Sequence, residues 1–84
     1  MKPVRLTNHA RLQCGERGAS EPEVVRAVRE GMQEPAKAGR VMCRYNFPFR
    51  GLWQGNRYSV KQVAPVIKEE SDEIVVITVY TFYF

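Results

Sequence analysis

The chain has 84 residues, of which 44% are hydrophobic and 26% charged, and its formal net charge is +4. This length suits one domain, residues 1–84, and excludes two separate cores. The longest uninterrupted apolar run, residues 74–77, is far below the roughly 20 residues that cross a bilayer, and no hydrophobic signal core follows Met1, so we expect a cytoplasmic protein without a membrane segment.

Cysteine and histidine are too few to predict a metal site. Cys14 and Cys43 stand far apart and form no Cys-x-x-Cys motif, so we expect two reduced core thiols rather than a disulfide. A structural zinc site usually takes four ligands, and His9 is the only histidine. The motifs of serine hydrolases, P-loop NTPases and dinucleotide-binding enzymes are also absent. We therefore expect neither a metal nor a cofactor.

The positive charge is unevenly distributed along the chain. Residues 1–62 carry 12 Lys and Arg against 5 Asp and Glu, whereas residues 63–84 carry 1 against 4. Arginine supplies 9 of the 13 cations, and its planar guanidinium suits both phosphate binding and base stacking. RNA is therefore a candidate partner, although small proteins also carry excess cations for solubility alone.

Two helices are predicted in the first third of the chain. Residues 6–17 repeat at helical spacing, and a second apolar stripe follows a Ser-x-x-Glu capping-box pattern. The expected caps and stops are Thr7 and Gly18 for the first helix, and Ser20, Glu23 and Gly31 for the second, whose stripe continues to Met32.

The rest of the chain predicts an antiparallel sheet. Residues 40–47 read as one strand, and residues 57–67 and 73–84 as a long hairpin that turns within residues 69–72. Pro65 cannot donate a ladder hydrogen bond, so it should lie at a bulge or with its missing donor facing outward. The fold class is therefore α+β, with two N-terminal helices packed on one face of a three- to four-stranded antiparallel sheet.

The predicted last strand is apolar on both faces and runs to the aromatic end of the sequence, residues 81–84. A central strand explains this pattern when both faces are covered within the chain. An outer face that meets another chain explains it equally well. A homodimer or another protein partner bound through the C-terminal strand is therefore a second candidate.

Two blocks of the sequence resemble a known bacterial family. Residues 8–18, NHARLQCGERG, are followed by Glu23 and Val24, and residues 74–80, IVVITVY, end in a Thr-x-Tyr motif. Together they are similar to the opening and the terminal strand of the family catalogued as domain of unknown function 4258. Cys14 departs from the usual apolar residue of that family, and the middle of the chain matches only loosely.

The resemblance implies a fold and a class of partner. The family is grouped with metal-independent ribonucleases and toxins that include barnase-like, EndoU-like, colicin nuclease and RelE-like proteins. A RelE-like fold with helices first and an antiparallel sheet after them is therefore expected, and so is a possible antitoxin partner. For many members no activity is established, so the fold transfers more safely than the reaction.

Cleavage of RNA without a metal needs a proton-transfer group and cations for the charge that builds on phosphorus. His9 is the natural proton-transfer group because its unperturbed pKa lies near neutrality. We expect Lys61 to lie opposite Tyr80 or Thr81 in the hairpin, where it would stabilise the phosphate charge while Tyr80 orients or protonates an oxygen. The catalytic candidates are His9, Lys61, Tyr80, Arg17 and Thr78.

Each of these candidates also has a structural alternative. His9 is equally well an ordinary surface or capping residue, and Arg17 could pair with a nearby glutamate or with backbone carbonyls. Lys61 could be a solvated lysine and Tyr80 a tyrosine at the edge of the core. The cations and aromatics that suit RNA binding, Arg44, Arg57, Tyr58 and Trp53, face the same alternative, since Trp53 fits a core anchor.

The leading hypothesis is a metal-independent, RNA-cleaving RelE-like toxin-type domain. The first alternative is a non-catalytic RNA-binding module on the same fold. The second is a protein-interaction domain whose terminal strand extends the sheet of a partner.

Overall fold

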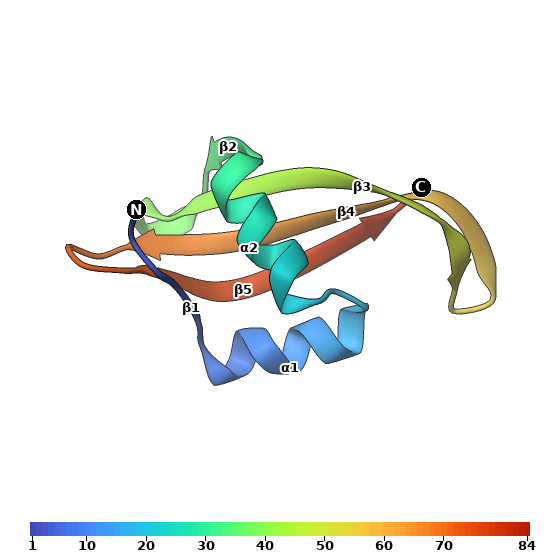
Figure 1. Ribbon diagram of the computed structural model, residues 1–84, viewed down its shortest axis with the longest axis horizontal. Helices are drawn as coiled ribbons and strands as arrows, with labels where there is room; N and C mark the ends of the chain where they lie inside the picture. The colour runs from blue at the N-terminus through green and yellow to red at the C-terminus, as the bar shows by residue number, and fades with distance from the viewer.

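The computed structural model describes all 84 residues and confirms the α+β class (Figure 1). The molecule is elongated, with extents of 41 × 24 × 24 Å. Neither helix has the length or the apolar composition needed to cross a membrane. In chain order the elements are β1 (Val4–Leu6), α1 (Asn8–Arg17), α2 (Glu21–Glu30), β2 (Met32–Pro35), the short 3-10 helix η1 (Lys37–Gly39), β3 (Val41–Trp53), β4 (Asn56–Glu69) and β5 (Ile74–Tyr83).

The five strands form one mixed sheet in the order β1-β5-β4-β3-β2. β1 pairs in parallel with β5, and the other neighbours are antiparallel. The predicted antiparallel sheet of three to four strands is therefore wrong in strand number and in the orientation of β1. The two additional strands are short, and each takes one residue from a predicted helix: Leu6 ends β1, and Met32 begins β2 with 79% of its surface exposed.

The predicted helix caps depend on local hydrogen bonds, and the structure confirms them. The Thr7 hydroxyl accepts from the Ala10 amide at 3.1 Å, and α1 ends at Gly18 in the left-handed conformation, with φ of 75°. Ser20 and Glu23 form the reciprocal capping box of α2. These caps satisfy amides that the helices themselves leave free, which is why they could be predicted locally.

The core lies between the two helices and one face of the sheet. Small residues allow close approach of the layers, since Ala10 and Ala27 are fully buried. At Gly31, directly after α2, a Cβ atom would lie 2.8 Å from the Arg44 carbonyl oxygen, so the end of α2 meets β3 backbone to backbone. The core cluster consists of Leu6, Ala10, Cys14, Val24, Ala27, Val28, Cys43, Val63, Ile67, Val76 and Val79.

Both cysteines are free and buried, as expected for core thiols. Cys14 lies on α1 and Cys43 on β3. Burial raises the pKa of each thiol, because the thiolate is poorly solvated in an apolar environment. They therefore act as small apolar side chains in the core.

The edge of β5 that faces away from β4 is covered by β1 along its first residues and by α1 further along the strand. β1 pairs only with Ile74–Val76. Beyond that point the Gln13 side chain accepts from the Val79 amide at 2.8 Å, and Arg17 donates to the Val79 carbonyl at 2.7 Å. Gln13 and Arg17 are four residues apart on α1 and therefore share one helix face. Together they replace the partner strand that β1 no longer provides.

The predicted hairpin is confirmed as β4 and β5. Its loop is closed by the Glu70 amide, which donates to the Glu73 carbonyl at 2.8 Å. Pro65 is fully buried in β4, directly before the register shift between Val66 and Ile67. Pro65 itself pairs in register with Val79, so it lies beside a bulge and not at one, as one of its two expected positions required.

Candidate nucleic-acid interface

The two faces of the sheet are covered differently. α2 crosses β4 and β3 on one face, and α1 runs beside β5 on the same side (Figure 1). We call this the covered face. Neither α1 nor α2 packs on the opposite face, which we call the open face. Side chains that point to the open face include Met42, Arg44, Gln62, Val66, Thr78, Tyr80 and Phe82.

Lys61 lies on the covered face and is engaged in structural contacts. Its ammonium group donates to the Gly18 carbonyl at 2.9 Å and to a Glu23 carboxylate oxygen at 2.8 Å. Its side chain is only 10% exposed. Burial alone would raise the pKa of Glu23, but the hydrogen bonds from Lys61 and from the Ser20 amide lower it below its usual range. Lys61 thus joins β4 to both helices.

The expected grouping of Lys61 with Tyr80 and Thr78 is wrong. Lys61 pairs with Tyr83, whereas Tyr80 pairs with Ala64. The prediction placed the turn too early, because β4 continues to Glu69 and the bulge near its end adds one residue to the register. A change of this kind moves side chains between faces of the sheet, so Lys61 points to the covered face while Thr78 and Tyr80 line a pocket on the open face.

His9 lies near none of the other catalytic candidates. It is exposed on the first turn of α1, and Lys61 binds the chain just beyond the last turn. The eight residues from His9 to Arg17 correspond to about 12 Å along the helix. The five catalytic candidates are therefore distributed over both ends of α1 and both faces of the sheet.

Arg17 has the structural role that was its alternative, because it binds a backbone carbonyl. Its guanidinium donates to the Val79 carbonyl and lies over the Tyr80 ring, 5.2 Å from the ring centroid. Because it closes the edge of β5, its position is fixed by the fold. The expectation that Arg17 pairs with a backbone carbonyl is confirmed.

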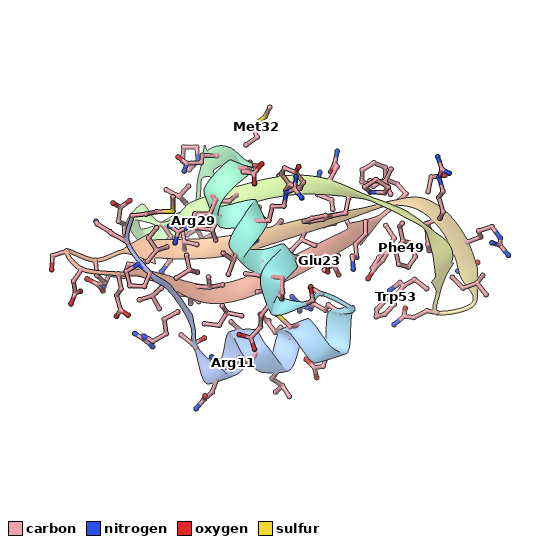
Figure 2. All side chains as sticks on the ribbon, in the orientation of Figure 1. Arg11, Glu23, Arg29, Met32, Phe49 and Trp53 are labelled. Carbon is pink, nitrogen blue, oxygen red and sulfur yellow. The ribbon has the colours of Figure 1, made fainter.

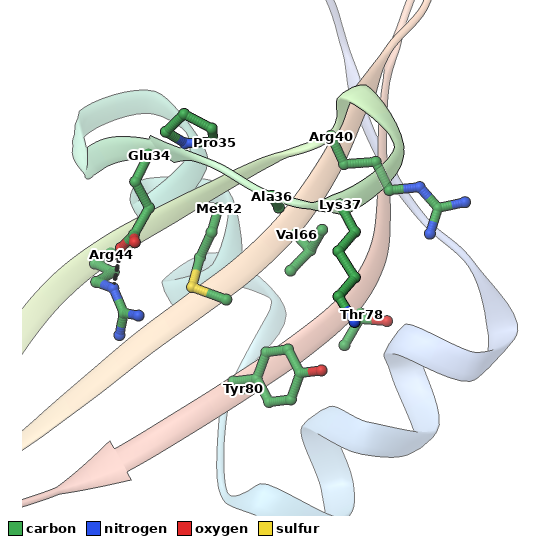
Figure 3. A pocket seen from close by; sticks show the side chains of 10 residues that line it. All are labelled: Glu34, Pro35, Ala36, Lys37, Arg40, Met42, Arg44, Val66, Thr78 and Tyr80. Atoms are coloured by element: carbon green, nitrogen blue, oxygen red, sulfur yellow. Dashed lines mark hydrogen bonds and ion pairs between the residues drawn. The ribbon is translucent and has the colours of Figure 1, made fainter.

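The open face carries a pocket of about 410 Å³ beneath β2 and η1 (Figure 3). This volume is within the range of ligand-binding pockets, roughly 300–1,000 Å³. Figure 3 shows Met42 and Val66 along its floor and the Tyr80 ring at one side. Its lining consists of Glu34, Pro35, Ala36, Lys37, Arg40, Met42, Arg44, Val66, Thr78 and Tyr80.

Arg44 links this pocket to the aromatic part of the open face. Its guanidinium binds Glu34 on the pocket side and donates to the Gln62 side chain at 2.9 Å. It also lies over the Phe82 ring, 5.3 Å from the ring centroid. Tyr80 and Phe82 stack with centroids 6.5 Å apart and are 39% and 41% exposed. Cations and accessible rings therefore alternate across this face.

Four cations in the middle of the chain have no acidic partner. No Asp or Glu occurs between Glu34 and Glu69, and seven Lys and Arg lie in that stretch. Three of them are held in ion pairs with glutamates outside it. The remaining four are Lys37, Arg40, Arg50 and Arg57. The sequence reasoning missed Lys37 and Arg40, although the absence of acids around them is visible in the sequence.

The predicted RNA-contacting residues are divided by the fold. Arg44 lies on the open face and Arg57 is exposed near the tip of the β3–β4 hairpin. Trp53 instead stacks on Tyr83 with centroids 4.9 Å apart, and Tyr58 leans on the same ring at 5.7 Å. Trp53 is thus a packing anchor, as its structural alternative predicts.

Known proteins add no further guide to this interface, because no family model, no curated protein and no solved structure matches the chain.

Proposed function

We propose that this protein binds single-stranded RNA on the open face of its sheet. The observation that carries the proposal is the juxtaposition of exposed Tyr80 and Phe82 with Arg44, beside a pocket bordered by unpaired Lys37 and Arg40. Unpaired bases stack on aromatic rings, and phosphates are neutralised by Lys and Arg, so this combination suits a flexible strand.

The proposal of RNA rather than another polyanion draws on the resemblance to the domain of unknown function 4258 family. The two resembling blocks are α1 and β5, which contact one another through Gln13, Arg17 and Val79. We propose family membership and the RelE-like ribonuclease-toxin fold on this basis. The sequence blocks thus form one structural unit at the edge of the sheet.

RNA cleavage stays a prediction beside RNA binding. Metal-independent cleavage requires the proton-transfer group and the cations to converge on one phosphate. Here His9 is exposed at the far end of α1 and Lys61 is committed to Glu23. The geometry therefore favours a binding module over a nuclease that uses His9 and Lys61 together.

The test is the affinity of the full chain for a labelled 12-nucleotide RNA of mixed sequence, measured by fluorescence anisotropy in EDTA. We expect Tyr80→Ala with Phe82→Ala to raise the Kd at least tenfold, because each base stacked on an aromatic ring contributes about 1–3 kcal/mol. The matched control is Leu12→Ala, which removes a 62% exposed apolar side chain from α1. Circular dichroism reports whether each variant stays folded.

The outcomes distinguish the three functions considered. Loss of affinity in the open-face variant alone supports the proposal, and equal affinity in all three proteins overturns it. If the wild-type chain binds no RNA but forms a dimer that the open-face variant abolishes, the interaction domain replaces it. Electrophoresis of the same RNA shows whether binding is accompanied by cleavage.

A further inference from the structure

The distal part of the β3–β4 hairpin extends beyond both helices and forms a separate surface, which we call the arm, residues 48–60 (Figures 1 and 2). The arm contains two cations, Arg50 and Arg57, and no acidic residue. It lies at the opposite end of the sheet from the Lys37 and Arg40 pocket. The proposed RNA site described above makes no use of it.

Irregularities in both strands bend the arm toward the helices. Two β3 residues, Phe49 and Arg50, lie opposite Ser59 alone, since Pro48 pairs with Val60 and Gly51 with Tyr58. On β4 the amides of Ser59 and Val60 both donate to the Phe84 carbonyl, at 3.1 and 2.8 Å. Two successive amides on one carbonyl, like two residues opposite one, mark a β-bulge, and bulges bend a strand.

The bent arm is fixed by aromatic packing on the covered side. Trp53 stacks on Tyr83, and Phe49 packs edge-on against the same ring at 5.2 Å (Figure 2). The Tyr83 hydroxyl donates to the Arg17 carbonyl at 2.8 Å. At Gly18 an added Cβ would lie 2.7 Å from the Trp53 ring, so the tip is held against the end of α1.

The outer surface of the arm continues the open face around this bend. Successive residues of a strand point to opposite faces, and cross-strand partners share a face. Leu52 therefore points away from the Trp53 side, together with its partner Arg57. Leu52 is 62% exposed and Arg57 is exposed, so a cation and an apolar side chain stand side by side on the outer surface.

Arg50 is held at the bulge in a conformation that non-glycine residues rarely adopt. Its φ is 48°, in the left-handed region, and its side chain is exposed without an ionic partner. Backbone strain of this kind persists where the surrounding structure imposes it, and it is common at binding sites. The bulge thus presents a second free guanidinium near Arg57.

We propose that the outer surface of the arm is a second contact for the RNA bound on the open face, with Arg50 and Arg57 neutralising its phosphates. This inference rests on the proposed function and adds a length requirement to it. The longest extent of the molecule is 41 Å, so only an RNA that runs along the sheet reaches both the pocket and the arm. Single-strand sites on one domain cover roughly 4–16 nucleotides, which brackets such a span.

The experiment compares a 4-nucleotide and a 12-nucleotide RNA of the same composition, the shorter one measured as a competitor. For Arg50→Gln with Arg57→Gln we expect the Kd of the longer RNA to rise about tenfold while that of the shorter RNA stays unchanged. The slope of log K against log salt should become shallower by about 1.4 for the longer RNA, because two phosphate contacts are lost at roughly 0.7 each.

The control is Arg11→Gln with Arg26→Gln, which removes the same charge from the two helices. Arg11 and Arg26 are exposed and lie in surface ion pairs with Glu21 and Glu30. An equal effect of this control, or an equal effect of the arm variant on both RNAs, overturns the arm contact and leaves the open-face site standing. Absence of binding to either RNA by the wild-type chain overturns the proposed function itself, and the arm contact with it.

Discussion

Lys61 on the covered face and Arg40 beside the open face carry the same charge in opposite surroundings. Lys61 is buried and holds Gly18 and Glu23 in place, whereas Arg40 lines a pocket and has no acidic partner. A cation that satisfies a buried carbonyl and carboxylate is not free to neutralise a phosphate. The comparison shows that the charge counted along a sequence exceeds the charge that a ligand can contact. Part of the charge is bound within the protein on the covered face.

Aromatic residues are divided between the two faces in the same way. Trp53 and Tyr83 stack on each other against the end of α1, and Tyr83 uses its hydroxyl to bind the Arg17 carbonyl. Burial raises the pKa of Tyr83, which keeps its hydroxyl protonated as a donor at neutral pH. The rings of Tyr80 and Phe82, in contrast, are exposed on the open face. Only the second pair can stack on a base without dismantling the fold.

The largest effect that tests this comparison is expected from Lys61→Ala. The variant leaves the Glu23 carboxylate and the Gly18 carbonyl without their buried donor, and removing one partner of a buried ion pair costs about 3–5 kcal/mol. Urea unfolding measures the loss in the free energy of unfolding. Lys68→Ala serves as the control because that ammonium is largely exposed and its ion pair contributes little.

A stable Lys61→Ala variant with reduced RNA affinity would contradict the comparison between Lys61 and Arg40. It would mean that Lys61 acts on the ligand and that its contact with Glu23 is incidental. The opposite result, lost stability without a change in RNA affinity of the folded fraction, places Lys61 in the fold alone.

A smaller loss, about 2–3 kcal/mol, is expected from Gly18→Ala. Gly18 has a φ of 75°, and its Cβ would lie 2.6 Å from the Tyr83 hydroxyl oxygen and 2.7 Å from the Trp53 ring. Thermal unfolding followed by tryptophan fluorescence reports both stability and the Trp53 environment. If Gly18→Ala costs as much in a Trp53→Ala background as in the wild type, contact with the Trp53 ring is not the cause of the loss.

Local features of the fold could be predicted from the sequence because their causes are local. Thr7, Ser20 and Gly18 cap or end helices through bonds to residues within four or five positions. The hairpin of β4 and β5 follows from its composition and its polar turn. β1 could not be predicted in this way, because a three-residue strand exists only where β5 and α1 already provide an edge.

The candidate site depended on register, which local patterns do not determine. One bulge near Val66 and a later turn placed Lys61 opposite Tyr83 instead of Tyr80. That pairing decides which face of the sheet each candidate side chain points to. Lys37 and Arg40 were missed because the pocket also needs η1 to lie over the sheet, a contact between segments far apart in sequence. The uneven distribution of charge was visible in the sequence, but the face of the sheet on which the free cations lie was not.

The pH dependence of stability gives a finer test of the covered face. The pKa of Glu23 is lowered in the folded protein, so the unfolded state binds more protons in acid and stability falls as pH drops through the folded pKa. The stabilisation is fully present above the unfolded pKa of about 4.3. We expect Glu23→Gln to flatten the decrease in unfolding free energy between about pH 5 and pH 2. A decrease as steep as in the wild type would assign the acid sensitivity to other carboxylates.

The smallest effect is expected from His9→Ala, and it decides between binding and catalysis. His9 is exposed on the first turn of α1, away from both the pocket and the arm, so its removal should change the free energy of unfolding by less than about 0.5 kcal/mol. RNA affinity should also stay unchanged. The decisive measurement is incubation of 5′-labelled RNA with purified wild-type and variant protein in excess EDTA. Cleavage that leaves 2′,3′-cyclic phosphate ends in the wild type and is lost in His9→Ala would show that His9 acts on RNA from the covered side, and the two faces would then share one function.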